Sequence, residues 1–279
     1  MALATMNFYA KSLRRFTTFN IIIPSDKIYL NQQDEPLKEK PYKTLYLLHG
    51  LLNGHTIWDS YSNIQALAND YNLCVVMPAG ENKFYVDSEV NDEYHCKLIG
   101  EELVKFTRQT FNLSDKREDT FIGGYSMGGY GALIVAFNYP ETFSKVIGLS
   151  SGVNKEMILT ADDTQKAFFT RKQYENIFGV EKLEDINNSK WDYNYMAKKI
   201  IDDNKPLPDI FLACGKQDFL NNYNVKFKNY LLELGYDVTW LEGEGEHNWD
   251  YWNPAIKKAI EWLNIPLDTK SVRGGKLVL

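Results

Sequence analysis

TFIGGYSMGGYGAL, residues 120–133, is the stretch that decides the fold. A short apolar run breaks at glycines around a serine and then continues with helical character, which predicts a strand, a sharp turn and a helix. The segment Gly124-Tyr125-Ser126-Met127-Gly128 matches G-x-S-x-G, a pattern in which the serine stands at the turn and its hydroxyl is pushed out of the sheet. Glycines are required beside it because a Cβ there would collide with the neighbouring strand and helix. Ser126 is therefore the candidate nucleophile.

The glycines of this stretch also allow other interpretations. A glycine-rich turn can simply pack a helix against a strand without any chemistry. A nucleotide-binding loop is excluded, because no Lys-Ser or Lys-Thr completes a P-loop and no G-x-G-x-x-G occurs in the segment. The choice between catalysis and packing depends on whether the rest of the chain supplies the fold and the partners that a catalytic serine needs.

Short apolar runs alternate with helical patterns along the rest of the chain. Runs typical of buried strands lie at 44–48, 73–77, 145–149, 209–214 and 238–241, and helical patterns fit 57–68, 94–111, 223–234 and 253–263. Such alternation is the signature of an α/β fold with a mostly parallel, doubly wound sheet. Residues 3–10 and 16–24 are rich in β-branched and aromatic residues around a basic turn, and they predict an antiparallel hairpin.

Residues 152–208 depart from this strand–helix alternation, because they form a connection far longer than a single crossover helix requires. They carry Phe168 and Trp191, among other aromatic residues, between many charges. Since ligands of such sheets bind at the carboxyl ends of the strands, an insertion that leaves strand 145–149 lands over that edge. We therefore expect a single domain, residues 1–279, in which 152–208 form a cap over the site. The alternative is a helical extension that packs away from the site.

Composition excludes several classes of function. The 279 residues carry a net charge of −6 and have a pI near 5.4, which argues against nucleic acids and anionic membranes as partners. The chain does not begin with a basic region followed by a long apolar stretch, and no window reaches the ~18 apolar residues of a membrane span. Cys74, Cys96 and Cys214 are odd in number, at spacings that suit neither zinc nor a redox pair. We expect a cytoplasmic protein with free thiols.

A catalytic Ser126 requires a histidine base and a carboxylate that fixes the tautomer of that histidine. In this fold the three follow in the order serine, acid, histidine. Of the four histidines only His247 lies after Ser126, in a glycine-bearing loop that follows the last predicted strand. Asp218, just past the carboxyl end of strand 209–214, is the preferred acid because its side chain can meet the His247 loop. The weaker candidates for the acid are Asp209, Asp237 and Asp250.

Hydrolysis through a serine also needs an oxyanion site, usually two backbone N–H groups. The N–H of Met127 at the start of the predicted helix supplies one, and that of Leu51, in the loop after strand 44–48, is expected to supply the other. His49 precedes this loop and is expected to brace it. His95, on a predicted amphipathic helix, is expected on the surface or in the core rather than in the site.

Four motifs, in this order, resemble those of the esterase D-like branch of the α/β-hydrolases. That branch holds tributyrin esterases, S-formylglutathione hydrolases, feruloyl and acetylxylan esterases and mycolyl transferases. The motifs are HGLLNGHTIW at 49–58, GYSMGG at 124–129, GKQD at 215–218 and GEHNWDYW at 245–252. The likeness covers nearly the whole chain and is strongest to the intracellular tributyrin esterases of Gram-positive bacteria. It implies an α/β-hydrolase fold with Ser126, Asp218 and His247 as nucleophile, acid and base. It also implies Leu51 and Met127 as the oxyanion amides.

The same motifs contain further candidate residues. We expect His55, Trp58 and Trp249 to line the substrate pocket. One departure from the family pattern lies in the oxyanion loop. S-formylglutathione hydrolases tend to have a Cys-Thr stretch there, whereas this chain has Leu51-Leu52-Asn53, which argues against formylglutathione as the substrate.

Together these observations predict a serine carboxylic ester hydrolase for short-chain acyl esters, which works through an acyl-enzyme intermediate without a cofactor or a metal. The alternatives are a feruloyl, cinnamoyl or acetyl-sugar esterase, and after those an S-formylglutathione hydrolase or an acyltransferase. A binding scaffold without catalysis is disfavoured because no member of the triad is missing. The expected partner is a small-molecule ester, and assembly into a homo-oligomer is compatible with the sequence.

Overall fold

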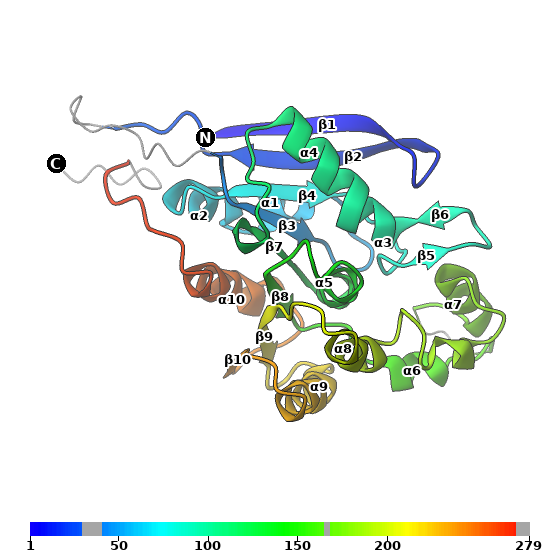
Figure 1. Cartoon of the computed structure of the whole chain (residues 1–279). Helices are drawn as coiled ribbons and strands as arrows, with labels where there is room; N and C mark the ends of the chain where they lie inside the picture. The colour runs from blue at the N-terminus through cyan, green and yellow to red at the C-terminus, as the bar shows by residue number, and fades with distance from the viewer. Residues whose placement is uncertain (30–40, 165–167, 272–279) are drawn as a thin grey trace.

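An eight-stranded sheet forms the centre of the molecule (Figure 1). The structure, a computed structural model, describes residues 1–29, 41–164 and 168–271. The strand order is β1-β2-β4-β3-β7-β8-β9-β10; β2 pairs antiparallel with both β1 and β4, and the remaining neighbours run parallel. The strands are β1 Ala2–Ala10, β2 Arg15–Ile23, β3 Thr44–Leu48, β4 Cys74–Pro78, β7 Thr120–Tyr125, β8 Lys145–Leu149, β9 Asp209–Gly215 and β10 Val238–Gly243, and a separate small hairpin pairs β5 Asp87–Ser88 with β6 Glu93–Tyr94. The predicted α/β fold with its N-terminal antiparallel hairpin is confirmed.

Helices cover both faces of the sheet (Figure 1). Those of one face, which share a core with β7, are α4 Leu103–Thr110, α5 Met127–Asn138, α8 Tyr193–Asp202 and α9 Asn221–Glu233. Those of the other face are α1 Ile57–Tyr61, α2 Ile64–Asp70 and α10 Trp249–Trp262. The shorter helical segments are α3 His95–Lys97, the π-helical turn Leu98–Glu102, the 3₁₀ turns Arg117–Asp119 and Leu183–Ile186, α6 Lys155–Leu159 and α7 Arg171–Phe178.

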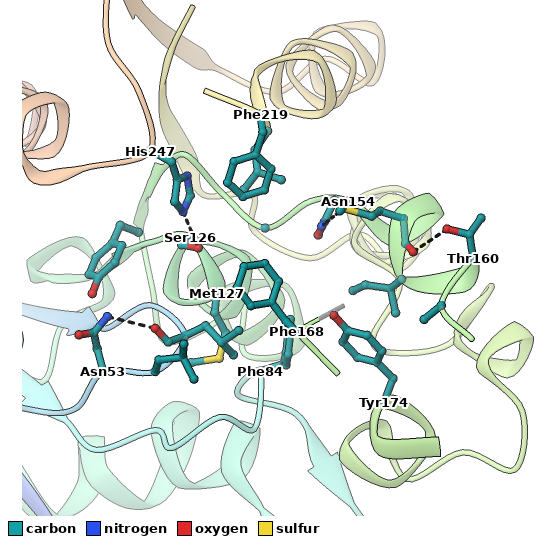
Figure 2. A pocket seen from close by; sticks show the side chains of 18 of the residues that line it. Asn53, Phe84, Ser126, Met127, Asn154, Thr160, Phe168, Tyr174, Phe219 and His247 are labelled. Carbon is teal, nitrogen blue, oxygen red and sulfur yellow. Dashed lines mark hydrogen bonds between the residues drawn. The ribbon is translucent and has the colours of Figure 1, made fainter. Parts of the chain in front are cut away.

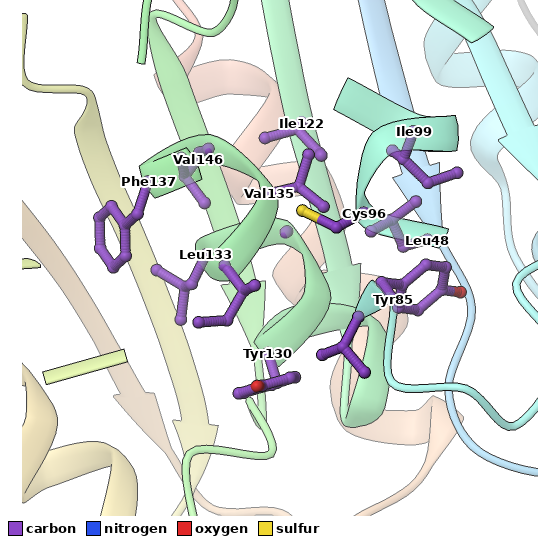
Figure 3. Packing of buried hydrophobic residues seen from close by; sticks show 14 of the residues in the cluster. Leu48, Tyr85, Cys96, Ile99, Ile122, Tyr130, Leu133, Val135, Phe137 and Val146 are labelled. Carbon is purple, nitrogen blue, oxygen red and sulfur yellow. The ribbon is translucent and has the colours of Figure 1, made fainter. Parts of the chain in front are cut away.

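The packing of α5 on β7 fixes the position of the turn between them. β7 lies between β3 and β8, and all of its residues are buried. Successive side chains of β7 point to opposite faces of the sheet, so Phe121 packs with α10 and Ile122 packs with α5. Figure 3 shows Val135 of α5 beside Ile122 of this strand, in the same buried cluster. Burial on both faces explains why the strand reads as a continuous apolar run rather than as an alternating one.

Two predicted helices differ in detail from the observed ones. The helix expected at 57–68 is divided between α1 and α2, because Ser62 takes an extended backbone and its hydroxyl bonds the carbonyl of Trp58 and the N–H of Ile64. The helix expected at 94–111 contains a π-helical turn. Gly100 lies in that turn, where a Cβ would stand 2.1 Å from the ring of Tyr139. Both departures follow from contacts that the apolar spacing does not encode.

The insertion at 152–208 has two structurally different parts. Its last helix, α8, packs on α5 and is part of the layer that covers the sheet. The earlier helices, α6 and α7, lie beyond the carboxyl edge (Figure 1). There α7 is tied to the β5–β6 hairpin, because the side chains of Ser88 and Asn91 both donate hydrogen bonds to the carbonyl of Asn176, over 3.1 and 2.8 Å.

Among the residues that the structure describes, no helix combines the length and the apolar character that crossing a membrane requires. Cys74 and Cys214 lie inside β4 and β9, and Cys96 lies in α3. All three cysteines are unpaired and buried, so the prediction of free thiols is confirmed.

A buried ion pair joins the segment after β2 to the segment after α10. The ammonium of Lys27 lies 2.8 Å from the carboxylate of Asp268, and these side chains are only 3% and 2% exposed. The hydroxyl of Tyr29 donates a second hydrogen bond to the same carboxylate, over 2.9 Å. Burial alone would raise the pKa of Asp268, but the hydrogen bonds from Lys27 and Tyr29 outweigh it and lower that pKa to about 2.

We predict that Asp268→Ala lowers the free energy of unfolding by about 3–5 kcal/mol, because it leaves the charge of Lys27 buried without a partner. Asp202→Ala, which breaks the exposed pair with Lys198 on α8, is the matched control and should cost at most about 1 kcal/mol. Urea unfolding measures both. Because the folded pKa of Asp268 is depressed, its contribution is present above pH ~4 and is lost as the pH falls toward 2. Equal effects of the two variants at pH 7 would contradict the assignment.

Candidate active site

Ser126 occupies a strained turn between β7 and α5. Its backbone has φ 55° and ψ −122°, a combination that non-glycine residues rarely adopt. The flanking glycines permit this turn, as predicted. A Cβ on Gly124 would stand 2.5 Å from the carbonyl carbon of Gly128, and one on Gly128 would stand 2.5 Å from the carbonyl oxygen of Leu48. The side chain of Ser126 is therefore presented at the carboxyl edge, at the N-terminus of α5.

The structure brings the three predicted catalytic side chains together. The Nε2 atom of His247 lies 3.0 Å from the Oγ of Ser126 (Figure 2). Its Nδ1 lies 2.9 Å from the Oδ2 of Asp218. The Asp218 carboxyl group is fully buried, whereas 21% of the His247 side chain is exposed. In this geometry Nδ1–H donates to the carboxylate, which leaves Nε2 free to accept the serine proton.

The loops that carry Asp218 and His247 are held against each other. Gly215 approaches Gly245 so closely that a Cβ on it would lie 2.2 Å from the carbonyl oxygen of Gly245. The N–H of Gln217 donates to that same oxygen over 3.0 Å, and its side-chain oxygen accepts from the N–H of Gly245 over 2.7 Å. Burial would raise the pKa of Asp218, but the hydrogen bond and the charge of His247 outweigh it and lower that pKa below its ordinary value. The acid therefore stays ionised.

The predicted oxyanion loop, which follows β3, borders the same pocket as Ser126. Leu51 and Met127 both line the pocket beside the serine. The loop is braced as expected by His49, whose Nδ1 donates to the carbonyl of Gly50 and whose Nε2 accepts from the N–H of Gly80, each over 2.8 Å. Burial lowers the pKa of His49 to about 4, so this ring is neutral at pH 7, as an Nε2 acceptor must be.

A cavity of about 590 Å³ opens beside Ser126 (Figure 2). Apolar side chains make up most of its wall, and the insertion supplies one side of it. The lining residues from the insertion are Gly152, Asn154, Met157, Ile158, Thr160, Ala161, Phe168 and Tyr174, and those from elsewhere include Leu51, Leu52, Asn53, Phe84, Tyr125, Met127, Phe219, Leu220, His247 and Trp252. The volume lies within the ~300–1,000 Å³ of pockets for small organic ligands.

The predicted pocket residues His55, Trp58 and Trp249 do not line this cavity. Trp58 is 1% exposed, and its indole N–H donates to the carbonyl of Leu48 over 3.0 Å, so it packs in the core and stabilises the end of β3. Trp249 packs edge-on against it at 5.1 Å between ring centroids. Both tryptophans pack edge-on against Tyr125. Trp58 lies in α1 and Trp249 begins α10, and both helices pack on the same face of the sheet, so neither ring points into the cavity.

Sequence reasoning missed several side chains of the cavity wall. Phe84 and Tyr174 come from distant segments and meet at 6.0 Å, a proximity that no local pattern reveals. Phe219 directly follows Asp218, and its ring lies 4.8 Å from that of His247. Its position next to the acid was a usable signal. Trp191, expected near the site, is buried instead, and its carbonyl accepts from Tyr130.

His95 lies in the core, one of the two places predicted for it. It is 1% exposed and stands beside Glu81 and Glu93 in a cluster whose ligand atoms could surround a metal ion. Arg15 pairs with both carboxylates, and Lys83 pairs with that of Glu93. Two cations already balance the two carboxylates, so an added divalent ion would leave the cluster strongly positive.

Several known proteins are similar to this chain. A family model described as "Esterase: Putative esterase" matches residues 11–263. An acetyl esterase of Caldicellulosiruptor saccharolyticus is 39% identical over 95% of this chain and 98% of its own. Two solved structures from Staphylococcus aureus, the fluorophosphonate-binding serine hydrolase FphF and the S-formylglutathione hydrolase FrmB, are each 31% identical. They cover 94% of this chain and 98% of their own, with TM-scores of 0.80 and 0.79. A ferulic acid esterase at 18% identity shares the fold, with a TM-score of 0.70.

We predict that Ser126→Ala lowers kcat for p-nitrophenyl acetate by about 10⁴-fold or more, because the attacking oxygen is lost. The same change should abolish covalent labelling by a fluorophosphonate, read as the loss of a stoichiometric mass increase. Ser60→Ala, which removes an exposed hydroxyl from α1, is the control and should keep both properties. Unchanged thermal midpoints would show that both variants are folded. Turnover or labelling by Ser126→Ala at the wild-type level would refute Ser126 as the nucleophile.

Proposed function

This chain belongs to the esterase family, and we propose that Ser126, His247 and Asp218 are the triad with which it hydrolyses carboxylic esters. The continuous hydrogen-bonded path between these side chains, with links of 3.0 and 2.9 Å, is the observation that carries the proposal. His247 removes the proton of Ser126 as its Oγ attacks the ester carbonyl. Asp218 stabilises the imidazolium that forms.

His247 next acts as an acid, which completes the acylation of Ser126. The imidazolium of His247 gives its proton to the departing alcohol, which leaves the acyl group bonded to Ser126. A water molecule then loses a proton to His247 and attacks the acyl-enzyme, and the carboxylic acid departs as Ser126 regains its proton. The backbone N–H groups of Leu51 and Met127 stabilise the negative oxygen of each tetrahedral intermediate, and each such donor contributes about 3–4 kcal/mol.

For the substrate we propose esters of short acyl chains. The acetyl esterase at 39% identity supports this class, and so does the apolar wall of the cavity. Because the cavity of about 590 Å³ must hold both the acyl and the alcohol portions, only part of it is available to the acyl chain. We also propose that the first part of the insertion, with Met157, Ile158 and Tyr174 in its wall, acts as a cap over bound ester.

An aromatic acyl group is the second candidate. Phe168 lines the cavity and is 64% exposed, so one face of its ring is free to stack on a cinnamoyl group. The departure at Leu51-Leu52-Asn53 still argues against formylglutathione, even though a 31%-identical neighbour is an S-formylglutathione hydrolase.

We also propose a cytoplasmic location, because the three cysteines are unpaired thiols.

We predict that kcat/KM for p-nitrophenyl esters rises about tenfold from acetate to butyrate, because each buried methylene contributes about 0.8 kcal/mol. It should then fall at octanoate, where the chain meets Phe84 and Tyr174 at the wall. Steady-state rates across the three esters and methyl ferulate measure this. An octanoate rate above that of butyrate would disprove the short pocket. If methyl ferulate were the best substrate, and Phe168→Ala selectively reduced the rate with it, an aromatic acyl group would replace the short acyl chain as the proposed substrate class.

A further inference from the structure

Phe219 presents an exposed aromatic ring next to the proposed catalytic base. The residue is 53% exposed, although it directly follows the fully buried carboxyl group of Asp218. The centroid of its ring lies 4.8 Å from that of His247, and the two ring planes meet at 52°. Figure 2 shows these rings next to each other, with Phe84 and Tyr174 farther away across the cavity. Covering an exposed phenyl ring with a bound molecule is favourable, so Phe219 is placed to contact the substrate.

The turn that carries Phe219 is held by the residue before it. The Oδ1 of Asp218 accepts a hydrogen bond from the N–H of Leu220 over 2.8 Å, and the carbonyl of Asp218 accepts one from the N–H of Asn221 over 2.9 Å. An aspartate that bonds the N–H two residues later fixes the backbone of the residue between them. The carboxyl group that binds His247 therefore also keeps Phe219 beside that histidine.

The chemistry of ester hydrolysis brings the alcohol portion of the substrate to this ring. The Nε2 of His247, 3.0 Å from the Oγ of Ser126, must give its proton to the departing oxygen, which therefore comes within about 3 Å of it. Trp252 also packs against the imidazole, at 4.9 Å, but it is only 5% exposed. Of these two rings Phe219 is by far the more exposed, so the group attached to the departing oxygen lies within its reach.

The composition of the cavity wall limits the chemistry of that group. Within the described part of the chain, no Asp, Glu, Lys or Arg lines the cavity. A charged alcohol or thiol would lose its hydration there without gaining an ion pair. An uncharged aromatic ring would instead gain the burial of its own surface and an edge-to-face or offset-stacked contact with Phe219.

We propose that Phe219 is the specificity-determining residue for the alcohol portion of the ester, and that this portion is an uncharged alcohol bearing an aromatic ring. The inference rests on the proposed function and adds to it the chemical class of the leaving group. The acyl chain occupies the other part of the cavity, where Phe84 and Tyr174 form the wall. Phe219 moves no proton: it covers the alcohol while His247 protonates the departing oxygen.

The test compares benzyl acetate with ethyl acetate. The two esters form the same acetyl-enzyme, and their alcohols are similar in acidity, so a difference in kcat/KM reports how the alcohol is bound during acylation. For the wild-type protein we expect kcat/KM to be about tenfold higher with benzyl acetate. Phe219→Ala should lower the benzyl acetate value about tenfold and leave the ethyl acetate value within about twofold, because only the benzyl group contacts the ring.

Two further variants serve as controls. Phe16→Ala removes a similarly exposed ring, 66% exposed, from β2 outside the cavity, and it should keep both rates. Phe219→Tyr retains the aromatic ring and should retain the preference for benzyl acetate. Because Phe219 is half-exposed, its variants should fold, which unchanged thermal midpoints would show.

Equal kcat/KM values for the two esters in the wild-type protein would overturn the inference. So would an equal loss for both esters in Phe219→Ala, since the ring would then act on His247 rather than on the alcohol. Ser126→Ala separates this inference from the proposed function. Hydrolysis of either acetate at the wild-type rate in that variant would refute the triad, whereas equal rates for the two esters in an enzyme that depends on Ser126 would refute only the role of Phe219.

Discussion

The site depends on the close approach of the Ser126 turn to the end of β3. A Cβ on Gly128 would stand 2.5 Å from the carbonyl oxygen of Leu48 and 2.6 Å from that of His49, so the two backbones touch with no side chain between them. This contact leaves the turn no relaxed alternative and holds Ser126 at φ 55°. It also places the start of α5 beside the loop that carries Leu51. One steric constraint therefore presents Ser126 at the sheet edge and brings together the segments of the proposed oxyanion site.

The strain at Ser126 is stabilised by the helix that follows it. The residues of α5 from Met127 to Phe137 are all buried, between the sheet and the neighbouring helices of its face. Such burial is worth about 1.5–3 kcal/mol for each large apolar side chain, whereas a strained backbone residue costs about 1–3 kcal/mol. Packing along the helix thus outweighs the unfavourable geometry at its first turn, and the partly exposed Ser126 is held in place by a rigid element.

Chemistry and substrate size are supplied by different layers of the molecule. Ser126 follows β7, Asp218 follows β9 and His247 follows β10, so the carboxyl ends of parallel strands bring the proposed triad to one edge. The cavity wall, in contrast, takes much of its lining from residues 152–161, from Phe168 and Tyr174, and from Phe84. A change in that wall can alter which esters fit without moving the reacting atoms, because the triad is held by hydrogen bonds among the strand-end loops.

The sequence by itself determined the strand–helix alternation, the turn at Ser126 and which three side chains make up the proposed triad. Each is encoded locally, by apolar periodicity, by glycines where a Cβ would clash, and by a chain order that leaves one histidine after the serine. Only the tertiary structure decided what lines the cavity. Trp58 and Trp249 share a motif with pocket and triad residues yet face the core, while Phe84 and Tyr174 meet across the cavity from distant segments. The direction of a side chain in a loop depends on the non-local packing of its neighbours, and spacing along the chain carries no record of that packing.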